Sequence, residues 1–310
     1  MSLTIQARCK VNLRLEVLGR RPDGYHELLT LFDRISLGDE VTLTQSNMTG
    51  AHLGRVSAGV PGGPENLAFR GVDAALRESD RRECGTRIDL VKHVPVGAGL
   101  GGGSADAAAA LVGVNRLWDL GLSEPRLLEI ARTLGADVPF FVHGHLRDAE
   151  REGSGRMALA SGVGERLRSV PDPPPLHYVL LNPGFEVKTS WAFQAGNFRL
   201  TGGPGRNEML QGVGTVPTLE GIEGGVPRTL DDVLRSLRND LEPVTAGRHP
   251  EILQLEKALL AAGAAGTRMS GSGPTVFGLF ASEGDAQRAR TELERRFAGS
   301  AVRIVAASGA

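Results

Sequence analysis

Residues 95–111, PVGAGLGGGSADAAAAL, place five glycines directly before an alanine-rich stretch of helical character. Glycine leaves main-chain N–H groups accessible because it has no Cβ, and the start of a helix carries about half a positive elementary charge. Together the two features form an anion site of phosphate size. A glycine-rich turn that only permits tight packing is the alternative, although such a turn needs only about one or two glycines.

Two common nucleotide-binding patterns fit this segment poorly. GxxxxGK[ST] fails because the chain contains no Gly-Lys pair. GxGxxG matches at Gly97, Gly99 and Gly102, but a dinucleotide fold requires a strand that runs directly into the loop and an acidic residue that ends the next strand. Here Pro95 intervenes, and Asp119 falls within a helical pattern. A hydride-transferring enzyme is therefore the lower-ranked alternative.

A second candidate for chemistry lies near the start of the chain. Residues 5–18 alternate strictly between apolar and polar, which predicts a half-buried strand with Lys10 and Asn12 side by side on its polar face. Lysine occurs only four times in this arginine-rich chain, so a lysine can mark a place where a compact ammonium is needed. A solvated lysine on an open strand face is the alternative.

The surrounding pattern must supply the elements that position these residues. Ser104 is predicted to be the N-cap of the alanine-rich helix, with Asp106 in its first turn, and residues 22–24 are a turn signal. In the second half of the chain, the order strand, helix, strand predicts an α+β domain. The predicted strands are 41–45, 87–94, 177–184 and 302–308, and the predicted helices are 65–79, 124–134, 231–237, 250–263 and 283–297.

Composition limits the classes of partner. A formal net charge of −1 gives no general attraction to nucleic acid or to an anionic membrane. The first ten residues lack a secretory pattern, and no apolar run approaches roughly 18 residues, so we expect a cytoplasmic protein. Cys9 and Cys84 have neither metal-ligand nor disulfide spacing and are predicted to be buried thiols.

Four segments, in order along nearly the whole chain, carry a resemblance to a known family. They are the glycine-rich segment, ARCKVNLRLEVLGRRPDGYHELLTLF, LGADVPFFVHG and MSGSGPTVFGLF. The glycine-rich segment resembles the phosphate loop of the galactokinase, homoserine kinase, mevalonate kinase and phosphomevalonate kinase (GHMP) superfamily. The PDGYH element and the GGGS form of the loop resemble the 4-diphosphocytidyl-2-C-methyl-D-erythritol kinase family within it.

The resemblance implies a two-domain α+β GHMP-kinase fold. Its N-terminal domain is ribosomal-protein-S5-domain-2-like, and its C-terminal domain is ferredoxin-like. We expect residues 1–166 to form the ATP-phosphate-binding and catalytic domain, and residues 167–310 to complete the substrate cleft between the domains. PDPPP at 171–175 is a stiff connector close to this boundary.

The resemblance also implies a reaction. ATP, accompanied by Mg2+, donates its γ-phosphoryl group to the 2-hydroxyl of a cytidine diphosphate alcohol in the non-mevalonate isoprenoid pathway. Lys10 and Asp137 correspond to the catalytic lysine and aspartate, although Asp137 alone would be interpreted as the N-cap of a helix beginning near Val138. The sequence identifies no Mg2+ ligand, since Ser104 is a candidate and Asp106 fits a role in complementing the helix dipole. Another small-molecule kinase of the superfamily, of the homoserine or mevalonate type, and a non-catalytic nucleotide-binding protein are the alternatives.

Binding residues follow by the same resemblance. Tyr25 would stack on the cytosine, His26 would hydrogen-bond its polar edge, and Phe193 would cover its other face. Without the resemblance, Tyr25 would be interpreted as a core residue and His26 as a surface turn residue. Asn12 and Thr189 complete the predicted substrate contacts. The predicted ATP contacts are Asn66 and Lys92 near the adenine, and Pro95, Val96, Gly97, Ala98, Gly99, Leu100, Gly101, Gly102, Gly103, Ser104 and Ala105 around the phosphates.

Three further segments are singled out. SGSGP, from Ser270 to Pro274, resembles the third motif of the superfamily, a loop that buttresses the phosphate site, and it also fits a simple hairpin turn. Residues 147–158 and 202–227 look longer than the family usually has. Neither enlarged segment interrupts a motif, and the sequence predicts no oligomeric state.

Overall fold

The chain divides into two compact units, each described here by itself. The computed structural model describes residues 1–150, 155–196, 198 and 226–310, so most of the enlarged segment 202–227 lies outside the described residues. Unit 1 consists of Met1–Cys9, Leu37–Val96 and Gly101–Gly155, and unit 2 of Lys10–Ser36, Gly97–Leu100 and Arg156–Ala310. The chain thus passes repeatedly from one unit to the other, and the division at residues 166 and 167 stays a prediction.

Two long strands, β1 (Ser2–Arg20) and β2 (His26–Ser46), contribute residues to both units. The alternation in residues 5–18 correctly predicted β1, but the prediction that its polar face is open was wrong. Lys10, Asn12 and Arg14 are only 3, 2 and 5 % exposed. Their burial is tolerated because Lys10 bonds to Asn12, and Arg14 bonds to Glu16 and to the Ser236 carbonyl, which compensates for lost hydration.

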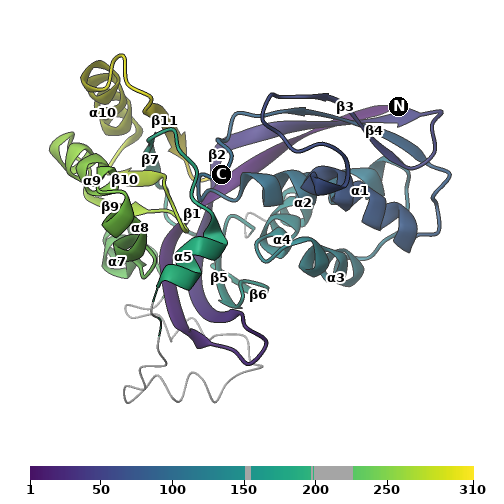
Figure 1. Cartoon of the computed structure of the whole chain (residues 1–310), viewed down its shortest axis with the longest axis horizontal. Coiled ribbons are helices and arrows are strands. Elements are labelled where there is room, and N and C mark those ends of the chain that lie inside the picture. Colours follow the sequence, from purple (N-terminus) through teal and green to yellow (C-terminus); the bar gives the residue numbers. More distant parts are fainter. Residues whose placement is uncertain (151–154, 197, 199–225) are drawn as a thin grey trace. The chain divides into compact units, whose positions relative to one another are not determined.

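Unit 1 places helices on one face of its strands (Figure 1). Strand β4 pairs antiparallel with residues 40–46 of β2 and parallel with β3. The predicted helix 124–134 is confirmed as α3, and 65–79 as α1 with slightly shorter bounds. The elements that lie wholly in unit 1 are β3 (Ala51–Val56), a 3-10 turn (Gly63–Glu65), α1 (Leu67–Glu78), β4 (Gly85–Val91), α2 (Gly102–Leu117), α3 (Glu124–Leu134) and α4 (Val138–Glu150).

Small residues allow α2 to lie at the centre of unit 1. A Cβ on Gly71 of α1 would be 2.7 Å from the Ala107 carbonyl oxygen, so the backbones of α1 and α2 are in close contact. A Cβ on Gly113 would be 2.7 Å from Ile5 and Leu43 of the strands. The alanine-rich sequence of α2 therefore reflects close packing on more than one side.

The start of α2 differs from the prediction. Gly101 has a left-handed backbone (φ 69°) and precedes the first helical residue, Gly102. Ser104 consequently lies inside the first turn, and the prediction that it is the N-cap was wrong. Asp106, the fifth residue of the helix, is buried and lies past the first turn, so the prediction that it lies in the first turn was also wrong. The glycines account for the difference, because they begin the helix without a capping side chain.

Unit 2 contains a four-stranded antiparallel sheet of order β11-β7-β10-β9. Along the chain its strands and covering helices follow the β-α-β-β-α-β order, which confirms the expected ferredoxin-like domain. The elements that lie wholly in unit 2 are β5 (Met157–Gly162), β6 (Arg166–Ser169), β7 (His177–Asn182), α5 (Thr189–Ala195), α7 (Leu230–Ser236), β8 (Arg238–Asn239), α8 (Glu242–Arg248), α9 (Glu251–Ala261), β9 (Gly266–Met269), β10 (Val276–Phe280), α10 (Glu283–Arg296) and β11 (Arg303–Ser308).

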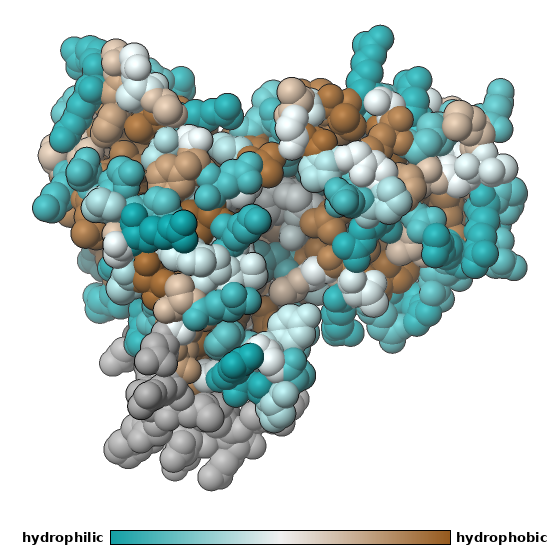
Figure 2. Space-filling model, in the orientation of Figure 1, coloured by the Kyte–Doolittle hydropathy of each residue, from teal (hydrophilic) through white to brown (hydrophobic). Residues whose placement is uncertain are grey.

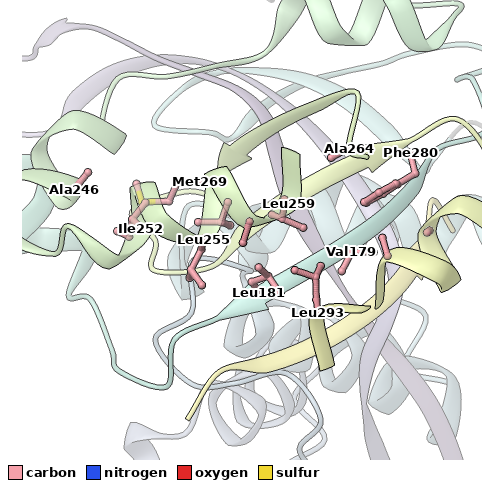
Figure 3. Close-up of a cluster of buried hydrophobic side chains, with 14 of the residues drawn as sticks. Val179, Leu181, Ala246, Ile252, Leu255, Leu259, Ala264, Met269, Phe280 and Leu293 are labelled. Atoms are coloured by element: carbon pink, nitrogen blue, oxygen red, sulfur yellow. The ribbon is translucent and has the colours of Figure 1, made fainter. Parts of the chain in front are cut away.

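The core of unit 2 lies between this sheet and its helices. Figure 3 shows Val179 and Leu181 of β7 in a cluster with Leu255 and Leu259 of α9 and Leu293 of α10. All five are nearly or fully buried. This cluster fixes the faces that α9 and α10 present to the sheet.

The face shown in Figure 2 is largely hydrophilic, and both cysteines are buried. Hydrophilic residues cover much of the face in Figure 2, with hydrophobic residues scattered among them. None of the helices in the described part of the chain is long and apolar enough to cross a membrane. Cys9 and Cys84 are buried thiols, as predicted.

Truncation of Leu255 tests this core. Leu255→Ala should lower the free energy of unfolding by about 2–5 kcal/mol, because it removes buried methyl groups and leaves a cavity. Leu253→Ala is the matched control, since Leu253 lies on the same helix and is 45 % exposed; it should change stability by less than about 0.5 kcal/mol. Urea titrations measure both, and equal losses would contradict the assigned core.

Candidate active site

The ammonium of Lys10 is held by backbone and amide oxygens of unit 2. Its Nζ donates to Asn12 Oδ1 and, at 3.0 Å, to the Gly99 carbonyl oxygen. It also lies 5.6 Å from the centre of the Phe32 ring. The backbone N–H of Lys10 donates to the Leu100 carbonyl at 3.0 Å. Two predicted site residues, Lys10 and Gly99, are therefore brought together.

The orientation of Asn12 is fixed by its other hydrogen bonds. Its Nδ2 donates to Thr30 Oγ1 at 2.8 Å, and that hydroxyl donates to the Arg14 carbonyl at 2.7 Å. Its backbone N–H donates to Ser270 Oγ at 3.2 Å. The amide oxygen is thereby directed to the Lys10 ammonium, which suits Asn12 to a role beside a catalytic lysine.

The glycine-rich loop uses backbone conformations that favour glycine. Gly97, Gly99 and Gly101 have φ of 63, 78 and 69°. A Cβ on Gly99 would lie 2.2 Å from the Ser270 carbonyl oxygen. Ser270 Oγ donates to the Gly99 carbonyl at 2.9 Å, and the Thr275 N–H donates to the Ala98 carbonyl at 3.3 Å. The loop within unit 2 is thus bound to the β9–β10 connection.

The loop residues differ in accessibility. Gly97 and Gly103 are exposed, as a bare-backbone anion site requires, whereas Ala98, Leu100 and Ala105 are buried. Val96 is 43 % exposed. The ATP contacts assigned to the loop, including Pro95, Gly102 and Ser104, stay predictions.

In unit 1 the Lys92 ammonium lies between two carboxylates. Its Nζ donates to Asp39 Oδ2 and to Asp106 Oδ2, the latter at 2.6 Å. Asp39 Oδ1 accepts the backbone N–H groups of His93 and Val94 at 2.6 and 2.8 Å. A Cβ on Gly102 would lie 3.3 Å from Lys92 Nζ. The ammonium therefore supports the first turn of α2, in addition to the role near the adenine predicted for it.

Two carboxylates and one ammonium share this buried site, which changes their protonation. Burial raises the pKa of Asp106, Lys92 opposes the shift and the neighbouring Asp39 adds to it, so that the resulting pKa is about 7. Burial works to lower the pKa of Lys92, but Asp106 and Asp39 outweigh it and the pKa is raised. Asp106 Oδ1 is buried without a hydrogen-bond partner. Protonation of Asp106 therefore relieves a surplus of negative charge.

Asn66 caps a helix. Its Oδ1 accepts the N–H groups of Ala68 and Phe69 at 2.9 and 3.4 Å, and its Nδ2 donates to the Pro61 carbonyl at 3.1 Å. Helix capping alone is therefore enough to explain why this residue is an asparagine. Its contact with adenine stays a prediction.

Asp137 is partly exposed and directly precedes α4, which begins at Val138. The interpretation of Asp137 as an N-cap predicted a helix that begins near Val138, and α4 begins there. That interpretation and the catalytic role both stay predictions for this carboxylate.

The PDGYH turn and α5 bring aromatic side chains together. His26 stacks on Phe193 at 5.1 Å between ring centres and meets the edge of Phe198 at 5.9 Å. Tyr25 is 65 % exposed, so the interpretation of it as a core residue was wrong. Burial, helped by the charge of Arg20, lowers the pKa of His26. A neutral imidazole at pH 7 offers one donor and one acceptor to a ligand.

The connection between β9 and β10 is a hairpin, as one interpretation of SGSGP required. Thr189, at the start of α5, shares a 3.0 Å hydroxyl–hydroxyl hydrogen bond with Ser272 in this connection. The connection thus contacts a predicted substrate residue as well as the loop Gly97–Leu100. Sequence reasoning missed Thr30, although it lies within a segment that carries the resemblance, and Asp39, which lies in no motif. The partners of Asp39 are more than 50 residues away in the sequence.

No group of three or more His, Cys, Asp or Glu side chains among the described residues is arranged to hold a metal ion. Asp106 directs one oxygen to the Lys92 ammonium. An ammonium in that position competes with a metal ion for the carboxylate.

Replacement of Asp106 tests the electrostatics of the Lys92 site. A pKa raised from 3.8 to about 7 means that stability from protonated Asp106 is present below pH 3.8 and is lost as pH rises to about 7. Asp106→Asn abolishes this loss. The free energy of unfolding of the variant minus that of wild type should therefore grow by at least about 1 kcal/mol between roughly pH 4.5 and 8. Urea titrations across this range measure it, and a difference independent of pH would contradict the assignment.

Comparison with known proteins identifies the family. The models of the GHMP kinases N-terminal domain and of the GHMP kinases C-terminal domain match residues 66–145 and 219–299. The chain is 46 % identical over 308 residues to the 4-diphosphocytidyl-2-C-methyl-D-erythritol kinase of Citrifermentans bemidjiense, covering 98 % of this chain and 99 % of the relative.

Solved structures agree. A crystal structure of a 4-(cytidine 5'-diphospho)-2C-methyl-D-erythritol kinase has a TM-score of 0.75 and 35 % identity, covering 99 % of this chain and 100 % of the other. Homoserine kinase from Cytophaga hutchinsonii has a TM-score of 0.69 at 22 % identity, covering 100 % of this chain and 94 % of the other, and shows the shared fold alone. The chain belongs to the 4-diphosphocytidyl-2-C-methyl-D-erythritol kinase family of the GHMP kinases.

Proposed function

We propose that this protein transfers the γ-phosphoryl group of ATP to the 2-hydroxyl of 4-diphosphocytidyl-2-C-methyl-D-erythritol, a step in the non-mevalonate isoprenoid pathway. The observation that carries the proposal is full-length similarity to a kinase of that name, over 98 % of this chain. Fold alone would not distinguish this substrate from homoserine or mevalonate, because GHMP kinases share the architecture.

Lys10 supplies fixed positive charge for the reaction. Phosphoryl transfer depends chiefly on positioning and on stabilising charge that develops on the transferred group. The Lys10 ammonium is anchored by Asn12 Oδ1 and the Gly99 carbonyl, so it needs little reorganisation during the reaction. A lysine on an open strand face would lack this preorganisation.

Asp137 accepts the proton of the acceptor hydroxyl. A partly exposed carboxylate at the end of a loop is accessible to a substrate hydroxyl. Proton removal by a positioned base makes the alcohol oxygen a better nucleophile. The glycine-rich loop and the first turn of α2 bind the ATP phosphates through main-chain N–H groups.

His26, Tyr25 and Phe193 recognise the cytosine. In the structure His26 is stacked on Phe193, so a cytosine ring on that face of Phe193 would take the place of the imidazole. We propose that a cytosine ring is stacked by Tyr25 and Phe193, with the neutral His26 imidazole on its polar edge. Thr189 contributes a hydroxyl beside the Ser272 connection.

Mg2+ enters with ATP in this proposal. It would neutralise charge on the phosphate oxygens. The Ser104 hydroxyl in the first turn of α2 suits a weak ligand, and Asp106 suits this role less because its carboxylate bonds to Lys92. The expected division of tasks between residues 1–166 and 167–310, and the cytoplasmic location, stay predictions.

A substrate comparison tests the reaction. Purified protein should release ADP from ATP with the cytidine substrate at least about 100-fold faster, as kcat/KM, than with homoserine, mevalonate or galactose, because buried polar contacts discriminate strongly. Equal turnover of all four, or turnover absent only with the cytidine compound, would overturn the proposal.

Removal of the base should slow chemistry. Asp137→Asn should lower kcat by at least about 100-fold, because general-base contributions typically have this size. The control is Asp148→Asn, since Asp148 is a 43 % exposed carboxylate on the following helix whose pairing with Arg8 is long, at 3.8 Å. The control should stay within about twofold of wild type. An Asp137 variant with wild-type kcat would remove that residue from the mechanism.

Removal of the buried ammonium should have a comparable effect. Lys10→Gln should lower kcat by about 10²–10³-fold, since it deletes fixed charge aimed at the reaction. Lys257→Gln is the control, because Lys257 is an exposed lysine on α9. Steady-state ADP release measures both, and similar kcat values for the two variants would contradict the role of Lys10.

A further inference from the structure

Asn239 is a buried side chain that the proposed mechanism does not use. It ends the two-residue strand β8, is paired with Leu15 of β1, and is 6 % exposed. Its Nδ2 donates to the carbonyls of Met269 and Gly271 at 2.7 and 2.8 Å, and its Oδ1 accepts the Leu241 N–H at 2.9 Å. One carboxamide therefore hydrogen-bonds to both the end of β9 and the connection that follows it.

Gly271, whose carbonyl accepts from Asn239, lies directly against the Lys10 site. A Cβ added to Gly271 would lie 2.9 Å from the Gly99 carbonyl oxygen, 3.3 Å from Asn12 Oδ1 and 3.4 Å from Lys10 Nζ. The carbonyl of Gly271 is thus held by Asn239, while the side on which a Cβ would lie faces the ammonium and the two oxygens that bind it. A shift of Gly271 would be transmitted to Lys10.

The hydrogen bonds next to Gly271 hold the residues on either side of it. Thr245 Oγ1 donates to the Ser272 carbonyl at 3.1 Å, and Glu242 accepts the Met269 N–H at 2.8 Å. These bonds flank Gly271 on either side. The Gly271 carbonyl itself accepts a hydrogen bond from Asn239 Nδ2 at 2.8 Å.

We propose that Asn239 is a positioning residue for phosphoryl transfer, which sets the place of Gly271 and thereby of the Lys10 ammonium. The inference rests on the proposed function and on the role of Lys10 in it. Displacement of a reacting group by about 1 Å can cost about 100-fold in rate. Asn239 acts through the backbone of the connection and touches no substrate.

The carboxamide of Asn239 donates two hydrogen bonds, whereas the carboxylate of an isosteric aspartate donates none. Asn239→Asp keeps the acceptor for Leu241 but presents an oxygen to two carbonyl oxygens. Burial against these carbonyls raises the pKa of the introduced carboxyl. Once protonated, the carboxyl donates one of the two lost bonds. Activity of this variant should therefore recover as pH falls, whereas Asn239→Ala has no group to protonate.

Nearby charges affect wild type and variants alike. Lys10 lies across Gly271, Arg238 and Asp240 flank Asn239 in sequence, and Glu242 lies beside β9. Glu256, whose pKa is raised to about 7 by burial and then by Glu242, titrates in all of these proteins. The ratio of variant kcat to wild-type kcat at each pH removes these shared titrations.

The experiment measures kcat and KM for ATP and the cytidine substrate from about pH 6.0 to 8.5. Asn239→Ala should lower kcat about 100-fold at all pH values, with KM values within about threefold of wild type. The ratio of the Asn239→Asp kcat to the wild-type kcat should be at least about fivefold higher at pH 6.0 than at pH 8.5. A flat Asn239→Asp ratio, or an Asn239→Ala kcat within twofold of wild type, would overturn the proposal. Where Asn239→Ala does not fold, the Asn239→Asp profile decides.

Asn115→Ala is the matched control. Asn115 also uses its amide to hold a turn, donating to the Leu122 carbonyl at 3.1 Å and accepting the Leu122 N–H at 3.0 Å. Its kcat should stay within about twofold of wild type even where its stability falls by as much as that of Asn239→Ala. An equal loss of kcat in Asn115→Ala would reduce Asn239 to a structural role.

Hydrogen exchange separates failure of this inference from failure of the proposed function. Amides of residues 270–273 should exchange faster in Asn239→Ala than in wild type or Asn115→Ala. Wild-type protein without turnover of the cytidine substrate would overturn the function, while unchanged exchange in Asn239→Ala would overturn the positioning role whatever the activity.

Discussion

The close backbone approach between the loop Gly97–Leu100 and the β9–β10 connection is the constraint on which the Lys10 site depends. A Cβ on Gly99 would lie 2.2 Å from the Ser270 carbonyl, and one on Gly271 would lie 2.9 Å from the Gly99 carbonyl. Any side chain at either position would separate the segments. Because the Gly99 carbonyl also binds the Lys10 ammonium, separation would remove an anchor of the charge to which we assign a role in the proposed phosphoryl transfer. Glycine here serves contact between backbones as much as access of a phosphate.

Two of the four lysines in this arginine-rich chain are buried in oxygen-lined sites. Lys10 is bound by a carbonyl and an amide oxygen, and Lys92 by Asp39 and Asp106. Burying an ammonium is costly unless its hydrogen bonds are replaced. A compact ammonium fits both sites, whereas a planar guanidinium requires a broader, bidentate arrangement. The two sites therefore fit the charge role that we propose for Lys10 and a structural role for Lys92 beside the start of α2.

The parts of the molecule that sequence predicted are those set by local pattern. Periodicity predicted α3 with its correct ends, and the resemblance to the GHMP kinases implied the ferredoxin-like domain that the sheet order confirms. Sequence failed where small or polar residues are placed by distant partners. The strand β5, MALASG, has small side chains without clear alternation. The polar face of β1 makes contacts with distant residues, such as the bond from Arg14 to the Ser236 carbonyl, more than 200 positions away. Asn239 has no motif, because its role depends on a loop 30 residues later.

The position of the transferred phosphoryl group tests the proposed reaction most directly. The carbon that bears the 2-hydroxyl of 4-diphosphocytidyl-2-C-methyl-D-erythritol also bears the methyl group, so it carries no hydrogen. In a proton-coupled phosphorus NMR spectrum of the isolated product, the new phosphomonoester should therefore give a resonance without three-bond coupling to hydrogen. A doublet or triplet would place the phosphoryl group on a secondary or primary hydroxyl and would contradict the proposed reaction, as would the absence of a new phosphomonoester resonance.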